Sequence, residues 1–142
     1  MRVLLAPDSF KEAASAEVIA QTMARGIMRG DPQAECRLLP LSDGGEGLTH
    51  ALVHATGGTL HDVETVDAVG RPIIAQFGFL GNKHTSRTAV VELASASGLE
   101  QVSPADRDPM AASTFGTGLL IHAAIDAGAC LLYTSEAADD RI

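Results

Sequence analysis

The chain has few aromatic residues and few basic residues, and each shortage excludes a class of partner. Aromatic residues make up 4% of the 142 residues and tryptophan is absent, so a surface that stacks the bases of single-stranded nucleic acid is not expected. Lys and Arg number 10 against 18 Asp and Glu, which gives a formal net charge of −8. Because no basic face is available to neutralise a phosphate backbone, we expect no nucleic-acid partner.

Cysteines and long hydrophobic runs are also scarce. The two cysteines, Cys36 and Cys130, have no spacing typical of a metal or redox site, which favours free thiols in a reducing compartment. No apolar run approaches the length of a membrane span, and the first residues do not form a secretory signal. The sequence therefore predicts a cytoplasmic protein with no membrane partner.

Short apolar runs and amphipathic segments alternate in the first third of the chain. Arg2–Ala6 and Cys36–Pro40 are short aliphatic runs that predict buried strands. Apolar residues recur every three or four positions over Ser15–Arg29, which predicts a helix capped by Ser15. A second helix is expected over Glu46–Ala55. This order of strands and helices is typical of a parallel α/β sheet.

The pattern changes near residue 68. Apolar residues alternate over Pro72–Phe79 and again over Arg87–Leu93, with a turn-rich connector between them, which predicts an antiparallel hairpin. A further helix is expected over Phe115–Ala127. The sequence therefore predicts part of a parallel α/β domain over 1–68 and the start of a mixed α/β domain over 69–129.

Residues 130–142 do not continue this pattern. Cys130–Tyr133 begins like an apolar strand, but Ser, Glu, Ala and Asp residues follow. The run CLLYTS, followed by an acidic and alanine-rich stretch, resembles the translation of a sequencing adapter. We interpret residues 130–142 as a non-native tail and exclude it from fold prediction.

Two polar loops follow the two predicted parallel strands. Ligands of parallel sheets bind outside the carboxyl ends of the strands, so Asp8–Lys11 and Ser42–Gly47 are expected at one edge. The glycines of the second loop let backbone N–H groups approach an anion, and the helix that follows directs its positive end at the same place. Asp43 and Glu46 are residue types that can ligate Mg²⁺.

The first loop carries a charge of each sign. Lys11 can neutralise a phosphate or a carboxylate, and Asp8 can accept a proton from a hydroxyl nucleophile. The alternative is that Asp8 and Asp43 are turn or capping residues and that the glycines only shape a turn. The second loop matches neither the P-loop nor the dinucleotide-binding fingerprint.

Two further features allow more than one interpretation. Thr114–Gly118 is a third glycine-bearing turn that opens a helix, and it can bind an anion or simply place Thr114 as an N-cap. Glu92 lies on the second strand of the predicted hairpin. It can reach a site or face solvent, and the sequence does not decide between these.

Six segments together resemble the glycerate kinase family, the bacterial type I enzymes that phosphorylate D-glycerate with ATP. They occur in the family's order and spacing and cover residues 1 to about 129. The six segments are APDSFK at Ala6–Lys11, LPLSDGGEG at Leu39–Gly47, ATGG at Ala55–Gly58, VGRP at Val69–Pro72, VELASASGLEQV at Val91–Val102 and TFGTGLLI at Thr114–Ile121.

The resemblance implies a fold and an activity. The implied fold is a flavodoxin-like (Rossmann-like) parallel-sheet domain, incomplete here, followed by the start of an inserted mixed α/β domain with an antiparallel hairpin. The implied activity is ATP-dependent phosphorylation of D-glycerate, with the 2-phosphate favoured as product and with ATP and Mg²⁺ as cofactors. This chain is then an amino-terminal fragment, which we expect to be inactive alone.

The resemblance also assigns roles to residues. Asp8, Lys11 and Asp43 are the expected catalytic residues. Asp8 or Asp43 orients or deprotonates the attacking hydroxyl, and Lys11 neutralises charge on glycerate or on the γ-phosphate. Asp43 and Glu46 are the expected metal ligands. The residues expected to bind substrate or phosphate are Ser9, Ser42, Gly44, Gly45, Glu46, Gly47, Thr114, Gly116 and Thr117.

Two alternatives to the kinase remain open. One is a non-catalytic α/β module that binds an anionic metabolite or a nucleotide. The other is a non-functional fragment, whose unpaired sheet edges would favour aggregation. The sequence does not predict an oligomeric state.

Overall fold

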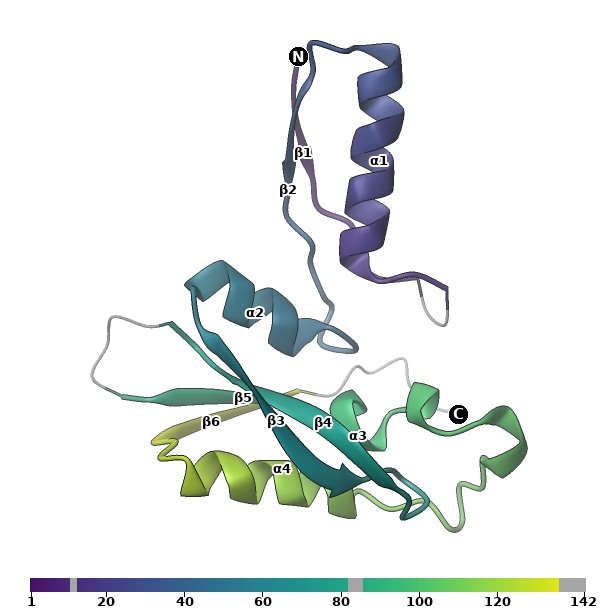
Figure 1. Ribbon diagram of the computed structural model, residues 1–142, viewed down its shortest axis with the longest axis vertical. Helices are drawn as coiled ribbons and strands as arrows, with labels where there is room; N and C mark the ends of the chain where they lie inside the picture. The colour runs from purple at the N-terminus through teal and green to yellow at the C-terminus, as the bar shows by residue number, and fades with distance from the viewer. Residues whose placement is uncertain (11–12, 82–85, 136–142) are drawn as a thin grey trace. The chain divides into compact units, whose positions relative to one another are not determined.

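A computed structural model describes residues 1–10, 13–81 and 86–135 of the chain. The chain forms two compact units, Met1–Asp43 and Gly44–Ile142 (Figure 1). Lys11 lies outside the described residues.

The first unit is a parallel β-α-β motif. Strand β1 (Arg2–Leu5) pairs in parallel with β2 (Glu35–Leu38), and helix α1 (Ala16–Gly30) connects them and packs on both. The hydroxyl of Ser15 accepts a hydrogen bond from the N–H of Val18 at 3.4 Å. The predicted parallel strands and the predicted cap at Ser15 are therefore confirmed. The prediction that both strands are buried is wrong for this chain, because Leu5 is the only buried residue of the two strands.

The second unit contains a mixed four-stranded sheet. Its strands are β3 (Thr59–Val66), β4 (Pro72–Phe79), β5 (Thr88–Glu92) and β6 (Leu131–Ser135), in the order β3-β4-β5-β6. The pairs β3–β4 and β4–β5 are antiparallel, and β5–β6 is parallel. The predicted hairpin of β4 and β5 is thus confirmed, while β3 was not predicted.

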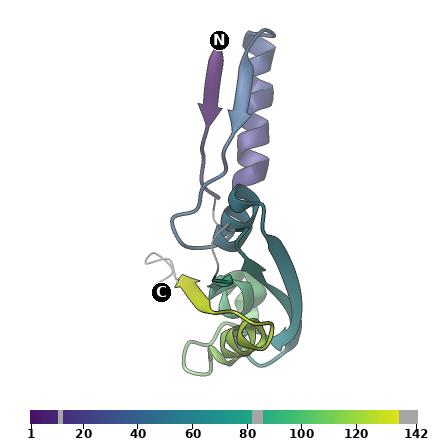
Figure 2. The ribbon, with the colours of Figure 1, turned by 90° about the vertical axis from the view of Figure 1, so that its left-hand side faces the viewer.

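Helices cover both faces of this sheet. They are α2 (Leu48–Thr56), α3 (Ala94–Ser97) and α4 (Phe115–Asp126), with short 3₁₀ turns at η1 (Leu99–Gln101) and η2 (Pro104–Asp106). Side chains alternate along β4, so Phe77 and Phe79 join the core cluster that contains Leu120 of α4. Gly78 faces the opposite side, toward Val53 of α2. Figure 2 shows the β3–β4 ribbon curving around α4.

Strand β3 extends the mixed sheet to residues before 69. All eight of its residues pair with β4, from Thr59 opposite Phe79 to Val66 opposite Pro72. The sequence placed the change of domain between residues 68 and 69, whereas the division between compact units follows Asp43. The strand escaped prediction because most of its residues are exposed or half-buried, so it has no clean apolar alternation.

The last described residues form strand β6. Leu131–Ser135 pair with Thr88–Glu92, although Leu131 and Tyr133 are more than half exposed. The interpretation of 130–142 as a non-native tail stays a prediction. In the part of the chain that the structure describes, no helix combines the length and the apolar character needed to cross a membrane.

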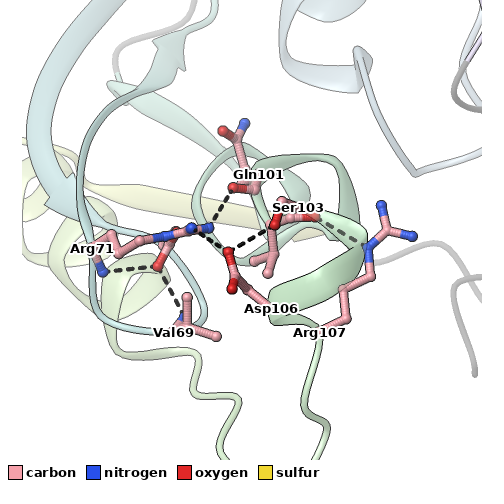
Figure 3. A network of polar contacts seen from close by, with 8 residues as sticks. Val69, Arg71, Gln101, Ser103, Asp106 and Arg107 are labelled. Carbon is pink, nitrogen blue, oxygen red and sulfur yellow. Dashed lines mark hydrogen bonds and ion pairs between the residues drawn. The ribbon is translucent and has the colours of Figure 1, made fainter.

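An ionic network ties the β3–β4 turn to the segment after α3 (Figure 3). The carboxylate of Asp67, 2% exposed, accepts hydrogen bonds from the backbone N–H groups of Val69 and Arg71 and from Nε of Arg71 at 2.7 Å. Arg71 also pairs through Nη1 with Asp106 at 2.9 Å and donates through Nη2 to the carbonyl of Gln101 at 3.4 Å. The network fixes where Gln101 lies.

Asp67→Asn is expected to make the free energy of unfolding decrease less in acid than it does in the parent chain. Burial raises the pKa of Asp67, but the hydrogen bonds from Arg71 and Val69 outweigh it and hold the pKa below the ordinary 3.8. A carboxyl group whose pKa is lowered on folding stabilises the native state at pH values above its pKa in the unfolded chain. This stabilisation is lost as the pH falls through the pKa of the native state. Urea unfolding at a series of pH values below 4 measures the effect. Asp106→Asn, whose carboxylate is 52% exposed, is the control and should change little.

Candidate active site

Asp8 joins the two loops that follow β1 and β2. One of its carboxylate oxygens accepts a hydrogen bond from the N–H of Ser9 at 2.6 Å, and the other accepts one from the N–H of Asp43 at 3.1 Å. Backbone hydrogen bonds from Leu39 to Leu5 and from Leu41 to Pro7 continue the pairing beyond the strands. The structure therefore brings together, at Asp8 and Asp43, the starts of the two loops that the sequence placed at one sheet edge.

Asp8 and Asp43 differ in exposure. Asp8 is half-buried and its carboxylate is engaged by backbone donors, whereas Asp43 is exposed. Ser9 and Ser42 lie beside them and are half-buried. The sequence left open which aspartate meets the reacting hydroxyl, and Asp43 is the more exposed of the two.

The glycine segment Gly44–Gly47 opens the second unit. Gly44 and Gly47 have φ angles of +115° and +87°, a left-handed conformation that non-glycine residues adopt only at a cost. Gly45 is buried and Glu46 is half-buried. Helix α2 begins at Leu48 with Gly47 as its N-cap, so the prediction of a helix from Glu46 was two residues too early, because the left-handed Gly47 interrupts helical geometry.

Glu92 is bound to this glycine segment. It ends β5, it is 4% exposed, and its two carboxylate oxygens accept hydrogen bonds from the N–H groups of Gly47 and Thr49, each at 3.0 Å. The first N–H groups of a helix have no partner within the helix, and a carboxylate there also interacts favourably with the helix dipole. An internal carboxylate thus occupies the place at Gly47 where the sequence predicted a ligand anion.

A cavity of about 320 Å³ lies beside Glu92 within the second unit. Its lining includes four carboxylates, those of Glu46, Asp62, Glu92 and Glu100, together with His50 and Gln101. Such a lining suits cations and hydroxyl groups and disfavours an anion that arrives without a cation. Over residues 1–10, 13–81 and 86–135, no group of three or more His, Cys, Asp or Glu side chains has the geometry of a metal site.

The third glycine-bearing turn, Thr114–Gly118, packs closely against neighbouring segments of the second unit. A Cβ on Gly116 would lie 1.9 Å from the carbonyl oxygen of Val66, and the backbone carbonyl of Gly116 accepts a hydrogen bond from the Thr65 hydroxyl at 2.9 Å. The hydroxyl of Thr117 lies 2.8 Å from that of Ser97. Thr114 is exposed, and within the described residues its side chain makes no capping hydrogen bond to α4.

The amino-acid sequence was compared with profiles of known protein families. The profile described as the glycerate kinase family matches residues 3–133. The chain belongs to the glycerate kinase family. The match includes every residue that the sequence proposed for the site, and it continues into the first residues of β6.

Individual relatives agree with this family. The chain is 46% identical over 129 residues to a glycerate kinase of Bacillus subtilis and 38% identical over 129 residues to a glycerate 2-kinase of Escherichia coli, covering 91% of this chain and 33% of each relative. A crystal structure from Salmonella typhimurium LT2 that carries the name glycerate kinase 2 matches with a TM-score of 0.67 and 42% identity, covering 94% of this chain and 36% of that one. The chain thus spans about one third of the length of these glycerate kinases.

These comparisons bear on the predicted fold and cofactor at a coarse level. The mixed α/β architecture, with its parallel and antiparallel sheets, is similar to that of a glycerate kinase structure. Membership of a kinase family implies use of a nucleotide. Glu92, which the sequence left undecided, lies in the VELASASG segment that carried the resemblance to glycerate kinases.

Glu92→Gln is expected to change how the stability of this chain depends on pH. Burial raises the pKa of Glu92 above the ordinary 4.5, although the N–H groups of Thr49 and Gly47 oppose the shift. Between 4.5 and the native pKa the native state binds more protons than the unfolded state, so the free energy of unfolding falls as the pH rises through that range. Urea unfolding from pH 4 to 8 should show this fall in the parent and not in the variant. An identical fall in both would contradict the assignment to Glu92.

Proposed function

We propose that the complete protein containing this chain transfers the γ-phosphoryl group of ATP to D-glycerate, giving 2-phosphoglycerate and ADP. The observation that carries the proposal is the hydrogen bond between Asp8 and the backbone of Asp43, which unites two loops in a chain of the glycerate kinase family. Relatives named glycerate kinase and glycerate 2-kinase support the substrate and the position of transfer. The 142-residue chain alone is expected to be inactive, because it spans about one third of those relatives.

Phosphoryl transfer depends on positioning and on neutralising charge. The exposed carboxylate of Asp43 orients the attacking hydroxyl of glycerate and accepts its proton. Asp8 holds the backbone of Asp43 in place through the 3.1 Å hydrogen bond. We assign Lys11 to neutralising charge on glycerate or the γ-phosphate, and Ser9 and Ser42 to substrate contacts.

Asp43 and Glu46 are the residues proposed to hold Mg²⁺. Both supply the carboxylate oxygens that a hard cation prefers, and Mg²⁺ needs only one or two of them beside phosphate oxygens and water. Glu46 lines the acidic cavity of the second unit, where a cation is favoured. When bound, Mg²⁺ neutralises the charge of the transferred phosphoryl group.

The remaining parts of the proposal concern the fold and the location of the protein. We assign the β1-α1-β2 motif to the start of a flavodoxin-like domain and the second unit to the inserted mixed domain. The net charge of −8 argues against a nucleic-acid partner, and we assign the protein to the cytoplasm, with a small-molecule substrate and no membrane partner.

The test begins with the complete reading frame. Sequencing the source DNA across the codons for residues 125–142 and beyond establishes whether the frame continues past Gly128 in place of the predicted tail. The complete protein and the 142-residue chain are then incubated with ATP, Mg²⁺ and D-glycerate. Release of ADP is measured, and the phosphorylated carbon is identified by NMR. L-Glycerate serves as the matched control substrate.

The outcomes separate the kinase from its alternative. We expect the complete protein to release ADP with D-glycerate and the 142-residue chain to release none. A folded complete protein that binds ATP or glycerate without turnover would favour the non-catalytic binding module.

A further inference from the structure

Glu92 is the buried carboxylate that connects the sheet of the second unit to the glycine segment. Strand β5, which it ends, pairs with β4, and all five of its residues are buried. The side chain is 4% exposed, and both oxygens are engaged by backbone N–H groups of the segment that leads into α2. The position of Glu92 is therefore set by a buried strand and not by a loop.

The position of α2 is restricted from the sheet side as well. A Cβ on Gly78 of β4 would lie 2.3 Å from a methyl group of Val53 and 3.1 Å from one of Thr49, so α2 lies directly against the backbone of β4. Glu92 holds the first turn of the same helix at Gly47 and Thr49. These contacts fix the amino end of α2, and with it the left-handed Gly47 that ends the glycine segment.

We propose that Glu92 is a positioning residue, whose carboxylate holds Gly47 and thereby keeps the preceding residues Gly44–Glu46 in the conformation that binds the substrates of the kinase. The inference rests on the proposed function, because it concerns the same loop. Glu92 acts through Gly47 and places the neighbouring Glu46, which lines the same cavity. This role does not follow from membership of the family. It is inferred from the two 3.0 Å hydrogen bonds that Glu92 accepts from the N–H groups of Gly47 and Thr49.

The role requires a carboxylate of this length. Glutamine offers one acceptor oxygen, and its amide group would place N–H donors against the N–H of Gly47 or Thr49. Aspartate keeps both acceptors but is shorter by one methylene, so it cannot reach both donors from the same backbone position. Glu92→Gln and Glu92→Asp therefore disturb the contact in different ways, one by chemistry and the other by reach.

The experiment compares these two variants with Glu64→Gln in the complete protein. Glu64 is an exposed glutamate on β3 of the same sheet and serves as the matched control. Hydrogen exchange, followed by mass spectrometry on peptides covering Gly44–His50, reports how firmly the segment is held. Steady-state kinetics with varied glycerate and ATP report kcat and KM, at a temperature where circular dichroism shows each variant to be folded.

The expected result is faster exchange in Gly44–His50 and a kcat/KM reduced about 10- to 100-fold in Glu92→Gln, since a misplacement of about 1 Å can cost about 100-fold. Glu92→Asp should recover part of both losses, and Glu64→Gln should match the parent. Folded Glu92 variants with parental exchange and kinetics would overturn the proposal. Failure of both variants to fold would also overturn it, because Glu92 would then serve stability alone.

The two proposals fail in different ways. If the parent protein shows no phosphorylation, the proposed function fails, and the exchange measurement still decides whether Glu92 holds the segment. If the parent is active and Glu92→Gln exchanges faster without any kinetic change, the positioning role fails and the kinase stands.

Discussion

Replacing Asp43 with alanine in the complete protein is expected to lower kcat for glycerate phosphorylation by about 10²- to 10⁴-fold, the usual contribution of a general base. The fold should be retained because Asp43 is exposed. The measurement is ADP release at saturating ATP and D-glycerate, with thermal unfolding of parent and variant as the check on folding. Glu35→Ala is the control, since Glu35 is an exposed acid in the same unit whose pairing with Arg2 at 3.6 Å is fully solvated.

Asp8→Asn separates the two aspartates. An asparagine oxygen can still accept one backbone hydrogen bond, so the variant should weaken the contact with Asp43 without removing its carboxylate. We therefore expect Asp8→Asn to reduce kcat less than Asp43→Ala does. If Asp8→Asn instead reduced kcat more than Asp43→Ala, and Asp43→Ala had a kcat close to that of the parent, Asp8 would be the proton acceptor and Asp43 would not.

The elements that the sequence predicted are those encoded locally. Helix α1 has its cap, its apolar periodicity and its stop signal within one continuous segment, and the short apolar runs on either side became the parallel strands β1 and β2. Strand β3 was missed because burial of its residues is decided by β4 and α4, which follow it in the chain. Its Thr65, and Asp67 just beyond its end, are buried polar residues that no periodicity rule identifies.

The same distinction explains the candidate site. The meeting of the loops after β1 and β2 follows from the rule that parallel strands end at one edge, and the Asp8–Asp43 contact agrees with it. The contact between Glu92 and Gly47 joins residues 45 positions apart, and only the packing of α2 on the sheet creates it. A glycine-rich segment before a helix suggested an open anion site, but the sequence could not show that an internal carboxylate occupies the helix end.

Gly116→Ala is expected to destabilise the protein by about 3 kcal/mol, near the upper end of the usual cost of overpacking. The added methyl group would lie 1.9 Å from the carbonyl oxygen of Val66, and backbone of an eight-residue strand cannot move aside as a side chain can. Urea or thermal unfolding of the complete protein measures the change. Helix α4 would have to move away from β3 and would lose the hydrogen bond from Thr65.

Gly118→Ala is the matched control for this prediction. Gly118 lies on the same helix, and no atom is within 4 Å of the place that an added methyl group would take, so alanine should stabilise the protein by up to about 1 kcal/mol through its higher helix propensity. The pair also decides between the two interpretations of the Thr114–Gly118 turn. A large loss of stability in Gly116→Ala alone assigns the glycine to close packing of α4 on β3. A parental stability with a raised KM would instead assign it to an anion contact, the other interpretation that the sequence allowed.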